Sequence, residues 1–276
     1  MSLKKLAIVT GSNKGIGFAI VKGLCERFQG DVYLTARNVT KGQEAVSKLK
    51  ALGYNPLFHQ LDITSETSIN KFRDHIKNQQ GGIDILINNA GVFATTSLPV
   101  GEVAEQDVGV NYFGTLKVCE ALFPLLRENA RVVNVSSSAG HLGRIPSADL
   151  RAKLKDPNLT IENLNLLMKE YVRSVKEGKN VENSWGTNAY SVSKVGLSAL
   201  TIIQQRIFDQ ELPNRNIAIN HVHPGWVKTD MNSTGKSTID EGARSSLFVA
   251  LDGTALKGKY IWWDCRIVEW DGPLPQ

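Results

Sequence analysis

The chain contains 276 residues with a formal net charge of +5, and 42% of its residues are hydrophobic. This length suits one α/β domain with a large core, which needs no disulfide or metal for stability. Three scattered cysteines, Cys25, Cys119 and Cys265, lack CxxC spacing. They argue against a disulfide framework and a metal site, and they favour a reducing, cytoplasmic location.

Membrane and nucleic-acid partners are both expected to be absent. No apolar segment approaches the roughly 18 residues of a membrane span, and the apolar run that ends at Gly11 is too short for a signal peptide. Lysines and arginines are interleaved with acidic residues, whereas a nucleic-acid-binding protein would cluster them on a stripe or module.

Short apolar runs alternate with amphipathic segments along the chain. Near-continuous apolar strands separated by helices indicate a parallel sheet covered on both faces. Right-handed crossovers then favour a Rossmann-like, doubly wound α/β fold, with one domain over residues 1–276. The expected strands cover residues 5–10, 31–36, 55–61, 83–89, 130–136, 216–224 and 257–264, and the expected helices cover 15–28, 40–52, 65–79, about 101–128 and about 190–209.

The segment "VTGSNKGIG" follows the first strand and opens the first helix, with glycines at positions 11, 15 and 17. Glycine has no Cβ, so a pyrophosphate can approach this backbone closely and accept hydrogen bonds from the helix N-terminus. The spacing is G-x-x-x-G-x-G, so the commoner dinucleotide fingerprint is not met. The strand–loop–helix context predicts a dinucleotide phosphate site; the alternative is a group of glycines that only ends the strand.

The second strand ends in "LTARNVTK", and Arg37 stands where an NAD site usually has an acidic residue for the ribose 2′-hydroxyl. Lys41 follows, and Lys14 lies in the glycine loop. A guanidinium can bind a 2′-phosphate through paired, charge-assisted hydrogen bonds. The sequence therefore predicts NADPH/NADP+ as the cofactor, with ordinary surface charges as the alternative.

A charged helical insertion is expected at about residues 141–187, between "NVSSSAG" and "NAYSVSK". Thr160 is the expected N-cap of a helix. An apolar stripe at helical spacing usually docks a helix on the body of a protein, and a cofactor role is the alternative. The stripe consists of Leu164, Leu167, Met168, Tyr171, Val172 and Val175.

Tyr190 and Lys194 are four residues apart in "NAYSVSK", so they share one face of a helix. Such pairs also occur in ordinary helices, and the context has to decide. His221 and His223 lie at i and i+2 near a strand end, a pattern more typical of structural histidines than of a metal site.

Five motifs occur in the order typical of the short-chain dehydrogenase/reductase family: "TGSNKGIG", "NNAG" at 88–91, "SSSAG" at 136–140, "YSVSK" at 190–194 and "PGWVKTDM" at 224–231. The chain resembles this family over essentially its whole length. "NYFGT" and the long insertion are similar to those of the monomeric NADPH-dependent carbonyl reductases. The resemblance implies a monomer, because the insertion resembles one that covers the helices through which oligomeric relatives associate.

The resemblance also implies a catalytic tetrad of Asn111, Ser137, Tyr190 and Lys194. Ser137 is preferred over Ser136 and Ser138 because it begins the S-x-x-G part of the motif. The implied cofactor site overlaps with the tetrad. It comprises Gly11, Ser12, Asn13, Lys14, Gly15, Ile16, Gly17, Arg37, Lys41, Asp62, Ile63, Asn89, Tyr190, Lys194, Val227 and Thr229.

These residues suit the reduction of a ketone, aldehyde or quinone. Tyr190 is expected to be the general acid, and a nearby ammonium and the oxidised nicotinamide should lower its pKa from about 10. Ser137 would hydrogen-bond the substrate oxygen. By resemblance, Lys194 also holds the nicotinamide ribose, and Asn111 holds a water that connects Lys194 to solvent.

The expected substrate pocket contains Ser137, Phe93, Trp226 and Met231, although ordinary packing is an equal alternative for the three apolar residues. Two other functions are alternatives. One is a dedicated reductase or dehydrogenase for a steroid, prostaglandin or pterin. The other is an NADPH-binding sensor without turnover, against which the complete tetrad argues.

Overall fold

The strands of the sheet bury apolar side chains on both faces. In β1 (Lys5–Val9), Leu6 and Ile8 pack on one face, and Ala7 and Val9 pack on the other. Successive residues of a strand point to opposite faces, so a strand that is apolar at every position belongs in the centre of a covered sheet. The computed structural model, which describes residues 4–94, 97–253 and 255–274, joins β1 to seven other strands in one sheet.

The strand order is β3-β2-β1-β4-β5-β6-β7-β8, and all neighbours are parallel except β7 and β8. The chain moves outward from β1 to β3 and then returns to β4. In such sheets ligands bind outside the carboxyl ends of the strands where the order reverses, here between β1 and β4. The strands are β2 (Gly30–Ala36), β3 (Leu57–Gln60), β4 (Ile83–Asn88), β5 (Leu126–Val135), β6 (Ala218–Val222), β7 (Tyr260–Ile261) and β8 (Ile267–Val268).

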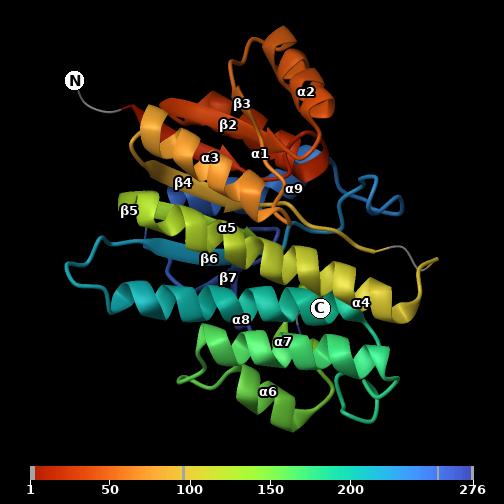
Figure 1. The fold of residues 1–276 in the computed structure, drawn as a ribbon. Helices are drawn as coiled ribbons and strands as arrows, with labels where there is room; N and C mark the ends of the chain where they lie inside the picture. Colours follow the sequence, from red (N-terminus) through yellow and green to blue (C-terminus); the bar gives the residue numbers. More distant parts are fainter. Residues whose placement is uncertain (1–3, 95–96, 254, 275–276) are drawn as a thin grey trace.

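Helices cover both faces of the sheet (Figure 1). Side chains of α1, α2 and α9 pack on one face, and side chains of α3, α5 and α8 pack on the other. The doubly wound α/β prediction is therefore confirmed. The helices are α1 (Gly15–Arg27), α2 (Val39–Ala51), α3 (Glu66–Gln79), α4 (Val100–Val108), α5 (Thr115–Leu122), α6 (Ala148–Leu154), α7 (Ile161–Lys176), α8 (Ala189–Asp209) and α9 (Ile239–Leu247). Among the described residues, no helix is both long and apolar enough to cross a membrane.

The predicted insertion contains α6 and α7, and α7 lies beside α8 (Figure 1). Thr160 Oγ1 accepts a hydrogen bond from the Asn163 backbone at 3.2 Å, as expected for an N-cap. The apolar stripe of α7 is packed into a core that it shares with α4 and α8. The stripe therefore docks the helix on the body of the protein.

The segment expected as one helix at about 101–128 is helical as far as Leu125, but it is not one regular α-helix. A π-helical turn, Gly109–Gly114, separates α4 from α5, and a 3₁₀ turn ends at Leu125. Strand β5 then begins at Leu126, earlier than expected, because this stretch pairs with β4. Arg127 donates to Asp84 Oδ2 and to the Gln80 carbonyl, both at 2.6 Å, which holds the polar start of β5 beside β4.

The last predicted strand, at 257–264, is shorter than expected and is half of a hairpin. Only Tyr260 and Ile261 are in β7, after which the chain reverses and pairs antiparallel as β8. The turn is tight: Cys265 has a φ of 71°, and its backbone N–H donates to the Trp262 carbonyl at 2.9 Å. Strand β8 was not predicted from the sequence, since its two residues give no periodic signal.

Candidate active site

A cavity of about 610 Å³ lies at the carboxyl ends of the central strands, where the strand order reverses. This volume is typical of cofactor and ligand sites. The structure brings most of the predicted residues together on its wall. The lining includes Gly11, Asn13, Lys14, Gly15, Ile16, Gly17, Arg37, Asp62, Ile63, Asn89, Phe93, Tyr190, Lys194, Thr229 and Met231.

Other predicted residues lie behind or beside this wall. Ser12 is fully buried, and its hydroxyl donates to the Val9 carbonyl at 2.8 Å, so it ties the glycine loop to β1. Val227 is also buried. Lys41 is exposed on the first turn of α2 outside the lining, and Trp226 is exposed while its Nε1 donates to the Thr234 carbonyl at 3.1 Å.

The glycine loop takes a shape that larger residues would disturb. Gly15 has a φ of 59°, a left-handed conformation that favours glycine. A Cβ on Gly17 would lie 2.4 Å from Asn89 Nδ2 and 2.8 Å from the Gly11 carbonyl. That amide donates to the carbonyls of Thr10 and Gly11, at 3.0 Å each. Asn89 therefore fastens the end of β4 to the loop, and Gly17 leaves the space that this contact needs.

Replacing Gly17 with alanine is expected to weaken NADPH binding by at least about tenfold, because the new methyl group displaces Asn89 and the loop. Fluorescence titration with NADPH measures the effect. Gly178→Ala is the control: Gly178 has a φ of 70° and open space around it. This control should lower the melting temperature by about 2–4 °C and leave NADPH affinity unchanged. Equal affinity in the Gly17 variant would contradict the prediction.

The charges at the far end of the cavity fit a phosphate. Lys14 Nζ pairs with Asp230 Oδ2 at 2.7 Å, and both side chains are exposed, so this ion pair is weak. Arg37 follows β2 directly and lines the cavity. Among the residues that the structure describes, no carboxylate lies within ion-pair distance of Arg37. An uncompensated guanidinium at this position suits the 2′-phosphate of NADP(H) rather than a bare ribose.

Local capping places the tyrosine and lysine of α8. Asn188 Oδ1 accepts from the Ser191 backbone at 2.8 Å, which starts the helix and puts Tyr190 in its first turn. Lys194 Nζ lies 5.8 Å from the centre of the Tyr190 ring and donates to the Val135 carbonyl at 2.8 Å. The two side chains thus share one end of the cavity, as their spacing predicts.

Ser137 is the serine of the "SSS" run that hydrogen-bonds the Tyr190 side chain. Ser136 lines the cavity and Ser137 does not, but Ser136 is buried and its hydroxyl lies 3.0 Å from the Ser198 hydroxyl. The Ser138 backbone N–H donates to His223 Nδ1 at 3.0 Å. The contact with Tyr190 favours Ser137 over its two neighbours for contact with a substrate oxygen.

Asn111 is buried in the π-helical turn and connects two parts of the site. Its Oδ1 accepts from the Val92 backbone at 2.8 Å, and its Nδ2 donates to the Val92 carbonyl at 2.9 Å and to Ser193 Oγ at 3.0 Å. Such π turns are frequent at functional sites. The amide therefore holds the loop after β4 against the helix that carries Tyr190 and Lys194.

Burial changes the protonation of both α8 groups. It raises the pKa of Tyr190 to about 12, with the Ser137 hydrogen bond acting in the opposite direction. It also lowers the pKa of Lys194 to about 8. The lowering expected from the oxidised nicotinamide and a nearby ammonium stays a prediction. In the folded chain, desolvation is the largest effect on the pKa of Tyr190, and the charge of Asp107 adds to the rise. Tyr190 is consequently a neutral phenol near pH 7, ready to donate a proton.

Asp107 is a buried carboxylate near the site that the sequence analysis missed. Its Oδ1 accepts from the Ala94 backbone at 2.8 Å, and its Oδ2 has no hydrogen-bond partner in the described chain. Its charge acts on Lys194, whose pKa it raises against the larger effect of burial. The signal was present in the sequence, since Asp107 shares a buried helix face with Ala104, Val108 and Asn111.

Replacing Asp107 with asparagine is expected to move the alkaline limb of the kcat/KM profile to lower pH. The change removes the negative charge that raises the pKa of Lys194, so that pKa falls below about 8. A protonated Lys194 then loses its proton earlier as the pH rises. The control is Glu105→Gln, which makes the same change in charge on the exposed face of α4. Identical profiles for Asp107→Asn and the wild type would contradict the prediction.

An exposed aromatic ring and a methionine stand at the mouth of the cavity. Phe93 is 53% exposed and meets the Tyr190 ring edge to face, with centroids 5.2 Å apart. Met231 is 47% exposed and also lines the cavity. For these two residues the geometry favours the pocket over ordinary packing. His221 and His223 are buried, and burial lowers their pKa values to about 3 and about 4.

Comparisons with known proteins agree with this geometry. Residues 5–148 match the family model described as short chain dehydrogenase. Carbonyl reductase (NADPH) 1 of Bos taurus is 41% identical over 273 residues, covering 96% of this chain and 98% of that protein. The solved structure of salutaridine reductase from Papaver somniferum has a TM-score of 0.85 at 34% identity, covering 95% of this chain and 100% of that one. Menthone neomenthol reductase from Mentha piperita has a TM-score of 0.81 at 29% identity, covering 94% and 99%.

The family resemblance predicted from five short motifs is thereby confirmed over nearly the whole chain. The motifs lie where the fold requires them: the glycine loop after β1, "NNAG" at the end of β4, "SSSAG" after β5 and "YSVSK" at the start of α8. The chain belongs to the short-chain dehydrogenase family.

Proposed function

We propose that this protein is an NADPH-dependent carbonyl reductase that converts ketones, aldehydes and quinones to alcohols and hydroquinones. One observation carries the proposal. A neutral Tyr190 phenol, in contact with Ser137 and near Lys194, stands at one end of a cavity. The other end is lined by Arg37, which has no carboxylate partner among the described residues. The 41% sequence identity to carbonyl reductase (NADPH) 1 of Bos taurus, over almost the full chain, supports the same activity.

Each polar side chain then has one task. Bound NADPH would supply the hydride that the carbonyl carbon receives. Ser137 donates a hydrogen bond to the substrate oxygen and stabilises its developing charge. Tyr190 transfers its phenolic proton to that oxygen as general acid. Lys194, with its Nζ 5.8 Å from the ring, stabilises the phenolate that forms, and Asn111 fixes the helix and loop that frame the pair.

A second candidate is a dedicated reductase for one bulky ketone, such as a steroid, prostaglandin or pterin. The similarity to salutaridine reductase, at a TM-score of 0.85, favours it. The exposed Phe93 at the cavity mouth suits a flat or polycyclic substrate as well as a small aromatic one.

A panel of substrates separates these functions by the rate of NADPH oxidation. We expect turnover of menadione and of an aromatic aldehyde. Turnover of a steroid ketone alone would support the dedicated reductase instead. NADPH binding without oxidation of any substrate would identify a non-catalytic sensor and overturn both proposals.

We further propose that the protein is a cytoplasmic monomer built as one domain. The packing of α7 against α4 and α8 supports the monomer, because it covers the outer side of these helices with the buried side chains of Leu164, Met168 and Val175. Multi-angle light scattering should give a mass near 30.3 kDa. A stable dimer or tetramer at micromolar concentration would contradict the monomer.

A further inference from the structure

We propose that Tyr260 is a positioning residue that aligns Ser137 for catalysis; this role rests on the function proposed above. Tyr260 lies in β7, distant in sequence from Ser137, and is 1% exposed. Its hydroxyl donates a hydrogen bond to the backbone carbonyl of Ser137. Tyr260 is absent from the cavity lining, and its hydrogen bond reaches the serine backbone rather than a reacting atom.

Aromatic contacts fix the ring that carries this hydroxyl. His221 stacks on Tyr260 with ring centroids 4.5 Å apart and an interplanar angle of 7°. Trp262 meets the ring edge to face at 5.7 Å and 82°. Burial keeps His221 neutral, with a pKa of about 3, so the stack is unchanged across the working pH range. His221 is therefore a structural residue that orients the Tyr260 hydroxyl toward the Ser137 carbonyl.

The turn that contains Ser137 runs from Ser137 to Gly140, and Trp270, which follows β8, holds its Gly140 end. Trp270 Nε1 donates to the Gly140 carbonyl at 2.7 Å, and the Leu142 backbone donates to the Trp270 carbonyl at 3.1 Å. On the β6 side, the Ser138 backbone donates to His223 Nδ1 at 3.0 Å. The segment from Ser137 to Leu142 is therefore fastened to β6 and to the hairpin along its length.

The Ser137 carbonyl also accepts a hydrogen bond from the Gly140 N–H at 2.8 Å, which closes the turn. Removing the Tyr260 hydroxyl therefore leaves the carbonyl with one partner and preserves the turn itself. What is lost is the tether that sets where the turn lies relative to α8, from which Tyr190 projects. Catalytic groups have to be held within about 0.5 Å of their working positions, so a small displacement of Ser137 is costly.

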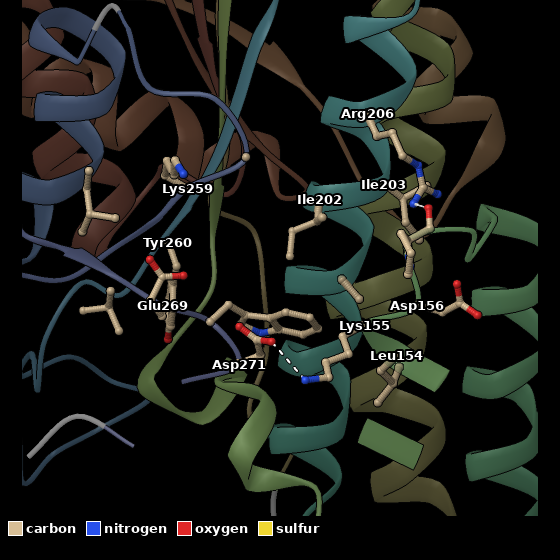
Figure 2. Close-up of a pocket in the computed structure, with 16 residues that line it drawn as sticks. Leu154, Lys155, Asp156, Ile202, Ile203, Arg206, Lys259, Tyr260, Glu269 and Asp271 are labelled. Atoms are coloured by element: carbon tan, nitrogen blue, oxygen red, sulfur yellow. Dashed lines mark hydrogen bonds and ion pairs between the residues drawn. The ribbon is translucent and has the colours of Figure 1, made fainter. Parts of the chain in front are cut away.

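A second cavity lies beside this tether. Tyr260 and Trp270 line this cavity, of about 230 Å³, between the hairpin and α8. Figure 2 shows Tyr260 and Glu269 facing Ile202 and Ile203 across this cavity, with the 3.2 Å ion pair of Lys155 and Asp271 beside it. The Tyr260 side chain is nevertheless buried in the core, where His141 meets it at 6.5 Å and 39°. The hydroxyl bond and the ring contacts together set the position of Tyr260.

A double-mutant cycle tests the role. Tyr260→Phe is expected to lower kcat for carbonyl reduction about three- to thirtyfold, the effect of one lost hydrogen bond. The dissociation constant of NADPH should stay within about twofold of the wild-type value. In a Ser137→Ala background the same change should alter kcat less than about twofold, since the group that Tyr260 positions is gone. Tyr33→Phe is the matched control, as it removes a hydroxyl 2.8 Å from His75 Nε2 outside the cavity.

An equal loss of kcat from Tyr260→Phe in both backgrounds, or no loss in either, overturns the positioning role while Ser137 stands. Wild-type turnover in Ser137→Ala alone overturns the role of Ser137 in the proposed function, and the positioning role with it. If a low melting temperature shows that Tyr260→Phe is poorly folded, Trp270→Phe replaces it in the same double-mutant cycle. This change removes the hydrogen bond from Trp270 to the Gly140 carbonyl.

Discussion

Replacing Tyr190 with phenylalanine is expected to reduce kcat for carbonyl reduction by about two to four orders of magnitude, the usual loss for a general acid. The substitution keeps the ring that meets Phe93 edge to face at 5.2 Å and removes only the hydroxyl. Without it, the substrate oxygen gains negative charge and has no proton donor at hand.

NADPH affinity shows whether the lower kcat arises in the proton-transfer step or from weaker cofactor binding. NADPH affinity, measured by fluorescence titration, should remain within about threefold of the wild-type value, since the glycine loop and Arg37 are untouched. Tyr112→Phe is the control: it removes a buried hydroxyl that donates to Asn165 Oδ1 at 2.8 Å and does not line the cavity. Near-normal turnover in Tyr190→Phe with NADPH still bound would disprove the assignment of Tyr190.

Residues whose roles depend on local backbone could be predicted from the sequence. Gly15 and Gly17 predict a tight loop, and the apolar run before them predicts the strand that leads into it. Asn188 caps α8, which fixes where Tyr190 and Lys194 begin their shared face. The carboxyl ends of parallel strands meet at one edge of the sheet, so strand order alone brings Arg37, Asp62 and Asn89 together.

Residues whose roles depend on distant packing could not be predicted. Tyr260 reaches Ser137 only because β7 pairs with β6 in register, which sets His221 beside Tyr260. The sequence showed an apolar strand and could not show which way the phenol points. The pKa of Tyr190 is a similar case. The lowering expected from an ammonium and the oxidised nicotinamide stays a prediction, whereas the amount of burial, which follows from the whole fold, raises the pKa.

Replacing Arg37 with alanine is expected to raise the dissociation constant of NADPH about ten- to hundredfold and to leave that of NADH within about twofold. The difference follows from the one phosphate that distinguishes the cofactors, because a charged pair of hydrogen bonds to it has no equivalent in NADH. Arg37 lines the cavity and has no carboxylate partner in the described chain, so its charge is available to a ligand. Titration of each cofactor into both proteins measures the preference.

Lys14 and Lys41 are the other basic residues predicted near the 2′-phosphate, so their variants show whether the effect is specific to Arg37. Lys14 forms an ion pair with Asp230 at 2.7 Å, and Lys41 lies outside the cavity lining. Alanine at either position should therefore lower NADPH affinity less than Arg37→Ala does. Lys48→Ala, on the exposed surface of α2, controls for the loss of net charge. Added salt should weaken NADPH binding more in the wild type than in Arg37→Ala, since an exposed charge pair is screened. Equal salt dependence, or equal loss of NADH and NADPH affinity, would mean that Arg37 supports the loop rather than the phosphate.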